Sequence, residues 1–133
     1  MTRSLQNIFD TVAEHLLIQS EKSILGGSCA YRGEDGRRCA IGVFIPDEYY
    51  DESMEGITLG CIPDNVDELA GDEVRFCQAL RNNGIDVYND KTIELLRMLQ
   101  RVHDAHLIKN WPEKLYWVAE RYGLDASVVE QPD

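Results

Sequence analysis

Apolar residues recur at helical spacing in several parts of the chain. Over residues 5–17 they follow an i, i+3, i+4, i+7 repeat, which predicts a helix with one buried face. Ser4 precedes this helix and is suited to be its N-cap. A second repeat follows Asp64 or Asn65 and stops at Asn83–Gly84. The expected buried residues of these two segments are Leu5, Ile8, Phe9, Val12, Leu16, Leu17, Val66, Leu69, Ala70, Cys77 and Leu80.

Two more helical repeats occupy the last third of the chain. Asn89 or Asp90 caps the first of them. The second begins at Asn110, with Glu113 completing its cap, and ends at Gly123. The expected buried residues are Leu95, Leu96, Leu99, Val102, His106, Leu115, Val118, Ala119 and Tyr122.

The segment near residues 28–41 has a strand-like pattern. The sequence GEDG in its middle tolerates positive φ and predicts a β-hairpin in which Cys29 lies opposite Cys39. The apolar run CAIGVFI then continues as a strand or begins a short helix, and so brief a run leaves both open. We therefore predict one α+β domain over residues 1–133, mostly helical with about four to five helices, a small hairpin and a frayed tail over residues 125–133.

Charge is distributed unevenly along the chain. The net charge is −11, from 24 acidic and 13 basic residues. Residues 46–73 hold ten acids and no Lys or Arg, whereas the other 105 residues hold 14 acids and 13 bases. Such a segment repels phosphate backbones and attracts a basic partner, which argues against direct binding of nucleic acid. The candidate partner-binding residues are Asp47, Glu48, Asp51, Glu52, Glu55, Asp64, Asp67, Glu68, Asp72 and Glu73.

The composition is that of a soluble folded protein, with 44% hydrophobic and 28% charged residues. The longest apolar run, residues 40–45, is far too short to span a membrane. The N-terminal segment is polar and charged throughout, so no signal peptide is expected. These features predict a cytoplasmic protein whose four cysteines, Cys29, Cys39, Cys61 and Cys77, are free thiols.

Part of the sequence resembles a group of small bacterial and phage proteins. The resemblance rests on CAYRGEDGRRCAIG at residues 29–42 and IPDEYY at residues 45–50. Weaker similarity continues through LQRVHD at residues 99–104 and VAERYGL at residues 118–124, so it covers most of the chain. The resemblance implies an accessory role on a phage or other mobile element, and it implies no catalytic residues.

Catalytic and metal-binding alternatives centre on cysteine and histidine. Cys39 with His103 and Asp104 would supply a nucleophile, a base and an orienting carboxylate. However, neighbouring residues on a helix do not face each other, so Asp104 is poorly placed to orient His103. His103 and His106 with Cys29 and Cys39 would supply four zinc ligands, but no C-x-x-C spacing supports such a site.

Four aromatic residues on the last predicted helix cannot all face a core. Trp117 is offset from the stripe that ends at Tyr122, so it either packs against a neighbour or forms an exposed contact patch. Residue-burial tendencies favour core packing. The four residues are Trp111, Tyr116, Trp117 and Tyr122.

Taken together, the sequence predicts a small acidic accessory protein that binds a basic host protein and needs no cofactor. The sharpest form of this hypothesis is a DNA-mimic inhibitor of a nuclease or defence complex, similar in role to an anti-CRISPR protein, in which carboxylates take the place of phosphates. One alternative is a small cysteine- or metal-dependent enzyme that uses Cys39 and His103. Another is a small-molecule-binding protein with a pocket beneath the hairpin.

Overall fold

A computed structural model describes residues 2–25, 28–29, 31, 33, 37–46, 48, 50 and 72–129. In these residues the α-helices are α1 (Leu5–Gln19), α2 (Asp72–Asn82), α3 (Asp90–Ala105) and α4 (Trp111–Tyr122). The shorter elements are β1 (Ile24–Leu25), β2 (Ser28–Cys29), and the 3₁₀ turns η2 (Gly42–Phe44) and η6 (Ile108–Asn110).

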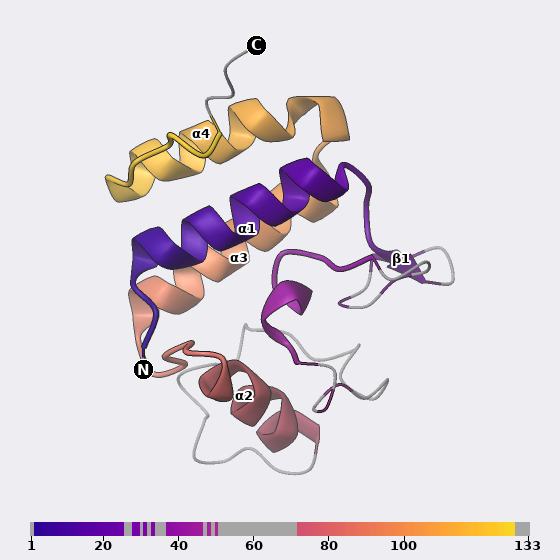
Figure 1. The fold of residues 1–133 in the computed structure, drawn as a ribbon, viewed down its shortest axis with the longest axis vertical. Helices are drawn as coiled ribbons and strands as arrows, with labels where there is room; N and C mark the ends of the chain where they lie inside the picture. Colours follow the sequence, from indigo (N-terminus) through magenta and orange to yellow (C-terminus); the bar gives the residue numbers. More distant parts are fainter. Residues whose placement is uncertain are drawn as a thin grey trace.

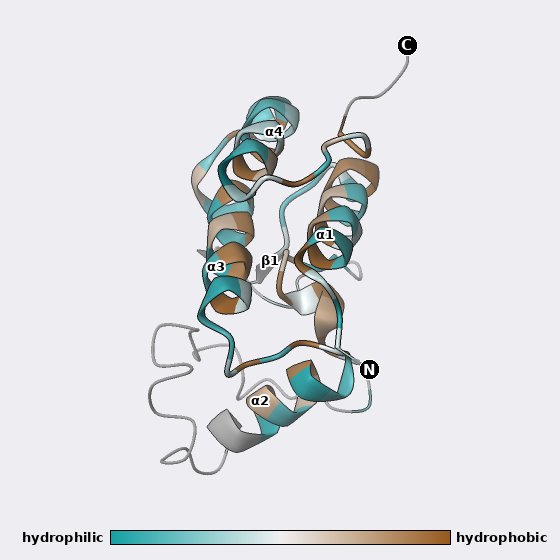
Figure 2. Ribbon diagram, turned by 90° about the vertical axis from the view of Figure 1, so that its left-hand side faces the viewer, coloured by the Kyte–Doolittle hydropathy of each residue, from teal (hydrophilic) through white to brown (hydrophobic). Residues whose placement is uncertain are grey.

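Helices α1, α3 and α4 pack against one another, and α2 lies at one end of this group, near the N-terminus (Figure 1). Figure 2 shows apolar residues on the sides of α1, α3 and α4 that face one another. The packing of these three helices forms most of the core.

The predicted caps of α1 and α3 are confirmed. Ser4 Oγ accepts the backbone N–H of Asn7 at 3.0 Å. Asn89 Oδ1 accepts the backbone N–H of Thr92, also at 3.0 Å. Each cap provides an acceptor for one of the N–H groups that lack a partner in the first turn of a helix.

The other helix boundaries confirm glycine as a stop signal and correct one cap. Gly84 and Gly123, with φ of 86° and 66°, lie just beyond the ends of α2 and α4. The predicted capping box at the start of α4 is wrong, because the Asn110 side chain makes no capping hydrogen bond. Helix α4 instead follows η6 directly and carries Pro112 in its first turn, where proline has no hydrogen bond to lose.

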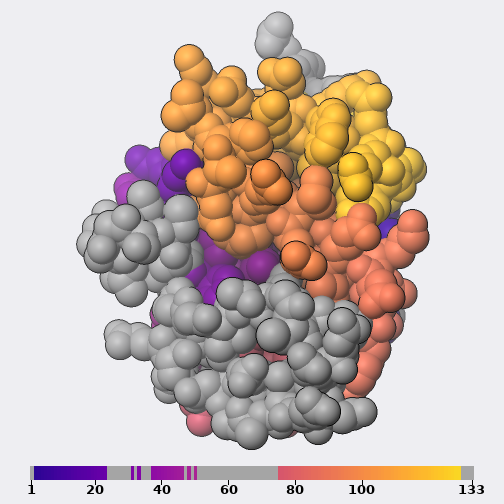
Figure 3. Space-filling model, turned by 180° about the vertical axis from the view of Figure 1, so that it is seen from behind, coloured from indigo at the N-terminus to yellow at the C-terminus, as the bar shows by residue number. Residues whose placement is uncertain are grey.

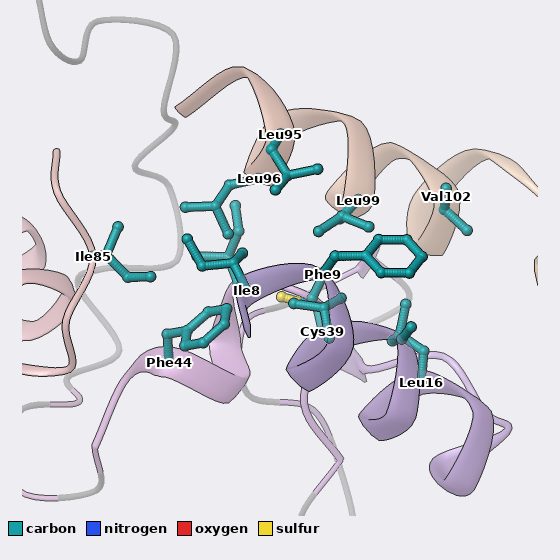
Figure 4. Packing of buried hydrophobic residues seen from close by; sticks show 14 of the residues in the cluster. Ile8, Phe9, Leu16, Cys39, Phe44, Ile85, Leu95, Leu96, Leu99 and Val102 are labelled. Atoms are coloured by element: carbon teal, nitrogen blue, oxygen red, sulfur yellow. The ribbon is translucent and has the colours of Figure 1, made fainter. Parts of the chain in front are cut away.

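The helical stripes form the core largely as predicted (Figure 4). Leu5, Leu17, His106 and Tyr122 are only partly buried. Expected core residues 66, 69 and 70 lie outside the described residues. The predicted residues that are buried are Ile8, Phe9, Val12, Leu16, Cys77, Leu80, Leu95, Leu96, Leu99, Val102, Leu115, Val118 and Ala119.

The predicted α+β class and the hairpin near residues 28–41 are wrong, because the described part of the chain is helical. Its strands are two residues long, and Cys29 pairs with Ile24 rather than with Cys39. Two backbone hydrogen bonds, from Gly33 to Arg37 and from Cys39 to Tyr31, close this segment, and Arg38 between them forms an isolated bridge rather than a strand. The apolar run that follows becomes η2, since its residues cover the core at the side of α1.

Side-chain hydrogen bonds tie both ends of the chain to the helices. The guanidinium of Arg3 donates to the Asn83 carbonyl oxygen at 2.6 Å and to Asn83 Oδ1 at 2.9 Å, which joins the N-terminus to the end of α2. Gln6 in α1 exchanges hydrogen bonds with the backbone of Asp125. The segment after α4, where the sequence predicts fraying from residue 125, is packed as far as the buried Val129.

Candidate functional site

Most of the predicted partner-binding residues lie outside the described residues. Glu48 is described and is exposed, and Asp72 and Glu73 are the first two residues of α2. The remaining seven, outside the described residues, are Asp47, Asp51, Glu52, Glu55, Asp64, Asp67 and Glu68.

Cys39 is part of the core rather than of a reactive site. Figure 4 shows its side chain among Ile8, Phe9 and Leu16 of α1, and it has no exposed surface. Its Sγ accepts a hydrogen bond from the backbone N–H of Gly42 at 3.3 Å. Burial nevertheless raises the pKa of the Cys39 thiol to about 12. The nucleophilic form is the thiolate, so Cys39 is chemically inert in this fold.

His103 is fully buried, and both of its ring nitrogens have partners. Its Nε2 lies 2.8 Å from the backbone nitrogen of Ser23, and its Nδ1 lies 2.7 Å from Asp104 Oδ1. A backbone N–H can only donate, so Nε2 accepts and Nδ1 carries the proton that is donated to Asp104. The expectation that Asp104 is poorly placed to orient His103 is wrong, because the carboxylate reaches the ring from the adjacent position.

Ser23, His103 and Asp104 have the composition of a catalytic triad but not its geometry. In a triad the serine hydroxyl bonds to the histidine base. Here the backbone of Ser23 makes that bond, and Ser23 Oγ donates to the carbonyl oxygen of Arg37 at 3.3 Å. The imidazole also stacks on buried Trp111, with ring centroids 5.6 Å apart. This cluster holds the chain before β1 against α3.

The proposed zinc ligands are not gathered into one site where the structure describes them. Within the described ranges, no three His, Cys, Asp or Glu side chains are grouped so that they could hold a metal ion. Cys39 and His103 are buried, whereas His106 is partly exposed and lines a groove. The Cys29 side chain lies outside the described residues.

That groove runs between α3 and α4 and has a volume of about 570 Å³. Trp117 and Tyr116, which the sequence assigns to core packing, are exposed over 52% and 41% of their surfaces, so that prediction is wrong for them. It is right for Trp111, which is 1% exposed. The residues that line the groove are Met98, Arg101, Val102, His106, Glu113, Lys114, Tyr116, Trp117, Val118 and Glu120.

The sequence contains a signal for this groove only in part. The offset of Trp117 from the buried stripe of α4 allows an exposed contact patch as one of two alternatives, and residue-burial tendencies favour the other. Arg101 and Lys114 look like ordinary surface residues in the sequence, since their approach to one groove depends on how α3 and α4 pack.

A second hollow of about 550 Å³ lies along α1, beside Val43. His15 lines it, and His15 Nε2 lies 2.9 Å from the carbonyl oxygen of Arg38. Burial lowers the pKa of His15; the hydrogen bond to the Arg38 carbonyl opposes this effect, and the charge of Arg38 adds to it. The neutral imidazole therefore donates to the Arg38 carbonyl and helps to hold the loop on α1.

Among the described helices, none combines the length and the apolar content needed to cross a membrane. Comparisons with family models, with curated proteins and with solved structures give no match to this chain.

Proposed function

We propose that this protein acts by binding, and that its acidic segment docks on a basic site of a partner protein. The observation that carries the proposal is the segregation of charge: residues 46–73 hold ten acids and no base in a chain whose remaining charges nearly balance. Opposite charges steer association and select partners, so a single-sign segment of this size favours a basic protein.

In its most specific form the proposal is a DNA mimic encoded by a phage or mobile element. Carboxylates take the place of phosphates in the nucleic-acid groove of a host nuclease or defence complex, and occupation of the groove is the whole mechanism. The proposed place of action is the cytoplasm of the host cell. Because such binding is electrostatic, it weakens as salt screens the charges.

The state of Cys39 and His103 supports binding over the alternative of a cysteine enzyme. A buried thiol with a pKa of about 12 is not a nucleophile at neutral pH. Both nitrogens of His103 are engaged in the core, where His103 has no exposed surface.

The test is affinity capture of host proteins at low salt by three forms of the chain. The first is the wild type, and the second neutralises the acidic segment with Asp47→Asn, Asp51→Asn and Glu55→Gln. The third has the same change in charge but carries Glu14→Gln, Glu113→Gln and Glu120→Gln. These three glutamates are exposed and make no side-chain hydrogen bond within the described residues.

We expect the wild type and the third form to retain a nucleic-acid-binding protein. The second form should retain about tenfold less of that protein. Added duplex DNA should release it, and so should about 0.5 M salt. Equal retention by the second and third forms would show that net charge, and not the acidic segment, is responsible. Release by salt but not by DNA would contradict the DNA-mimic version of the proposal and leave docking on a basic partner standing.

A further inference from the structure

The groove between α3 and α4 has the size and the floor of a small-ligand site. Its volume of about 570 Å³ lies within the range of about 300–1,000 Å³ that is typical of ligand pockets. Val102 and Val118, which are almost completely buried, contribute its apolar floor, and Met98 adds a flexible apolar side chain. The groove therefore offers a concave apolar surface built on two packed helices.

Trp117 gives this surface a flat aromatic face. Half of its surface is exposed, although burial of a tryptophan is strongly favourable. The Arg121 guanidinium lies 5.8 Å from the centroid of the Trp117 ring, so one side of the ring already has a cation beside it. A planar apolar group that packs on Trp117 would remove this exposed surface from water.

The charges around the groove favour an anion. Arg101 on α3 and Lys114 on α4 approach it from opposite helices, and Arg121 adds a third positive charge beside Trp117. Within the described residues, neither Arg101 nor Lys114 makes an ion pair or a side-chain hydrogen bond. Glu113 and Glu120 also line the groove, so the two cations and the two carboxylates of its lining balance, and the excess of one cation comes from Arg121 beside Trp117. In a chain with a net charge of −11, this local excess has the opposite sign.

We propose that the α3–α4 groove binds a small aromatic anion, with its flat apolar body against Trp117 and its acidic group between Arg101 and Lys114. The ligand class is a planar ring system that carries one carboxylate, sulfonate or phosphate group. The lining residues of this site fall at positions 98–120, outside the acidic segment in the sequence, and the proposal does not depend on the docking proposal.

Two fluorescent probes test the proposal, because they share an aromatic body and differ in charge. 8-Anilinonaphthalene-1-sulfonate carries a sulfonate, and N-phenyl-1-naphthylamine lacks it. We expect the sulfonate probe to bind about tenfold more tightly than the neutral one. The double variant Arg101→Gln, Lys114→Gln should remove this difference, and Trp117→Ala should weaken both probes.

The matched control is Lys91→Gln, Arg97→Gln, which removes the same charge from exposed positions of α3 that do not line the groove. It should bind both probes like the wild type. Equal affinity of the two probes for the wild type, or an equal effect of the control and groove variants, would overturn the proposal. Circular dichroism checks whether Trp117→Ala folds. If it does not, the groove and control charge variants still test the proposal, because Arg101 is exposed and Lys114 is partly exposed, so their substitution should not disturb the core.

Discussion

At the scale of single residues, burial decides the chemistry of the cysteine and histidine side chains. Cys39 and His103 are the residues that a search for catalytic groups selects, yet both lie in the core without exposed surface. The thiol of Cys39 is held in its protonated form, and His103 is held by hydrogen bonds to Ser23 and Asp104. Their role in the described fold is structural.

Cys39 should be unreactive in the native protein. Its thiol pKa of about 12, against an ordinary value of 9.0, leaves very little thiolate at pH 8, and burial blocks access as well. We expect iodoacetamide to modify Cys39 about a hundredfold or more slowly in the native chain than in guanidinium. Mass-spectrometric mapping of each cysteine measures this, and equal rates in the two states would contradict the buried assignment.

His15 should make the protein less stable at mildly acidic pH. Its pKa is lowered from the usual 6.5 in the folded state, so the unfolded chain binds more protons near that pH. The stability that neutral His15 provides is fully present above about pH 6.5 and is lost as the pH falls from there through the lowered pKa of the folded state. Urea unfolding at about pH 7.5 and about pH 5.5 measures the loss. It should be smaller in His15→Gln, and an identical loss would rule out His15 as a source.

At the scale of elements, the same residue type has different roles at different positions. Gly123 ends α4 in a left-handed conformation with open space around it. Gly42 begins η2, and a Cβ atom there would collide with the backbone carbonyl of Tyr31. One glycine is required by its dihedral angles and the other by a close approach of two chain segments.

Gly42→Ala should therefore destabilise the protein more than Gly123→Ala. Backbone atoms of Tyr31 cannot rotate away, so we expect a loss at the upper end of the overpacking range of about 1–3 kcal/mol, or beyond it. Gly123→Ala should cost about 1–2 kcal/mol from the left-handed conformation alone. Urea unfolding of both variants tests this order, and a smaller loss for Gly42→Ala would show that the loop at Tyr31 moves freely.

The helix caps provide a second matched pair. Asn89 caps α3 with a side-chain hydrogen bond, whereas Asn110 precedes α4 without one. We expect Asn89→Ala to lower the free energy of unfolding by about 1 kcal/mol and Asn110→Ala to have a much smaller effect. Equal losses in thermal or urea unfolding would mean that the two asparagines act in the same way.

At the scale of the whole molecule, the excess charge and the exposed aromatic residues belong to different parts of the sequence. The acidic excess belongs to residues 46–73, whereas the α3–α4 groove has exposed aromatic residues and a charge-balanced lining, with Arg121 as one further cation beside Trp117. In the face shown in Figure 3, residues of α3 and α4, coloured orange and yellow, form a continuous surface over the upper part of the molecule. The two proposals therefore concern different parts of the chain and fail independently.

The net charge of −11 should make stability rise with moderate salt, because self-repulsion among the acids is screened. We expect the melting temperature to increase by about 2–5 °C between low salt and about 0.3 M sodium chloride. The variant Asp47→Asn, Asp51→Asn, Glu55→Gln should show a smaller increase. A melting temperature that falls with salt would mean that attractive ion pairs outweigh the repulsion.

Local features of the sequence determined much of the helical architecture. Ser4, Asn89 and Gly123 mark their helix ends because capping depends on residues a few positions apart, and the apolar stripes of α1, α3 and α4 become buried because helical periodicity is also local. The charge segregation behind the proposed docking function is likewise a property of the sequence.

Contacts between distant segments decided the rest. Cys29 pairs with Ile24 rather than Cys39, with only two glycines between β1 and β2 in the sequence, and the run after Cys39 folds over the core instead of forming a strand. The groove that joins Arg101, Lys114 and Trp117 exists only once α3 and α4 pack together. Which helices become neighbours depends on the burial of the whole apolar surface, and a residue-by-residue pattern does not contain that information.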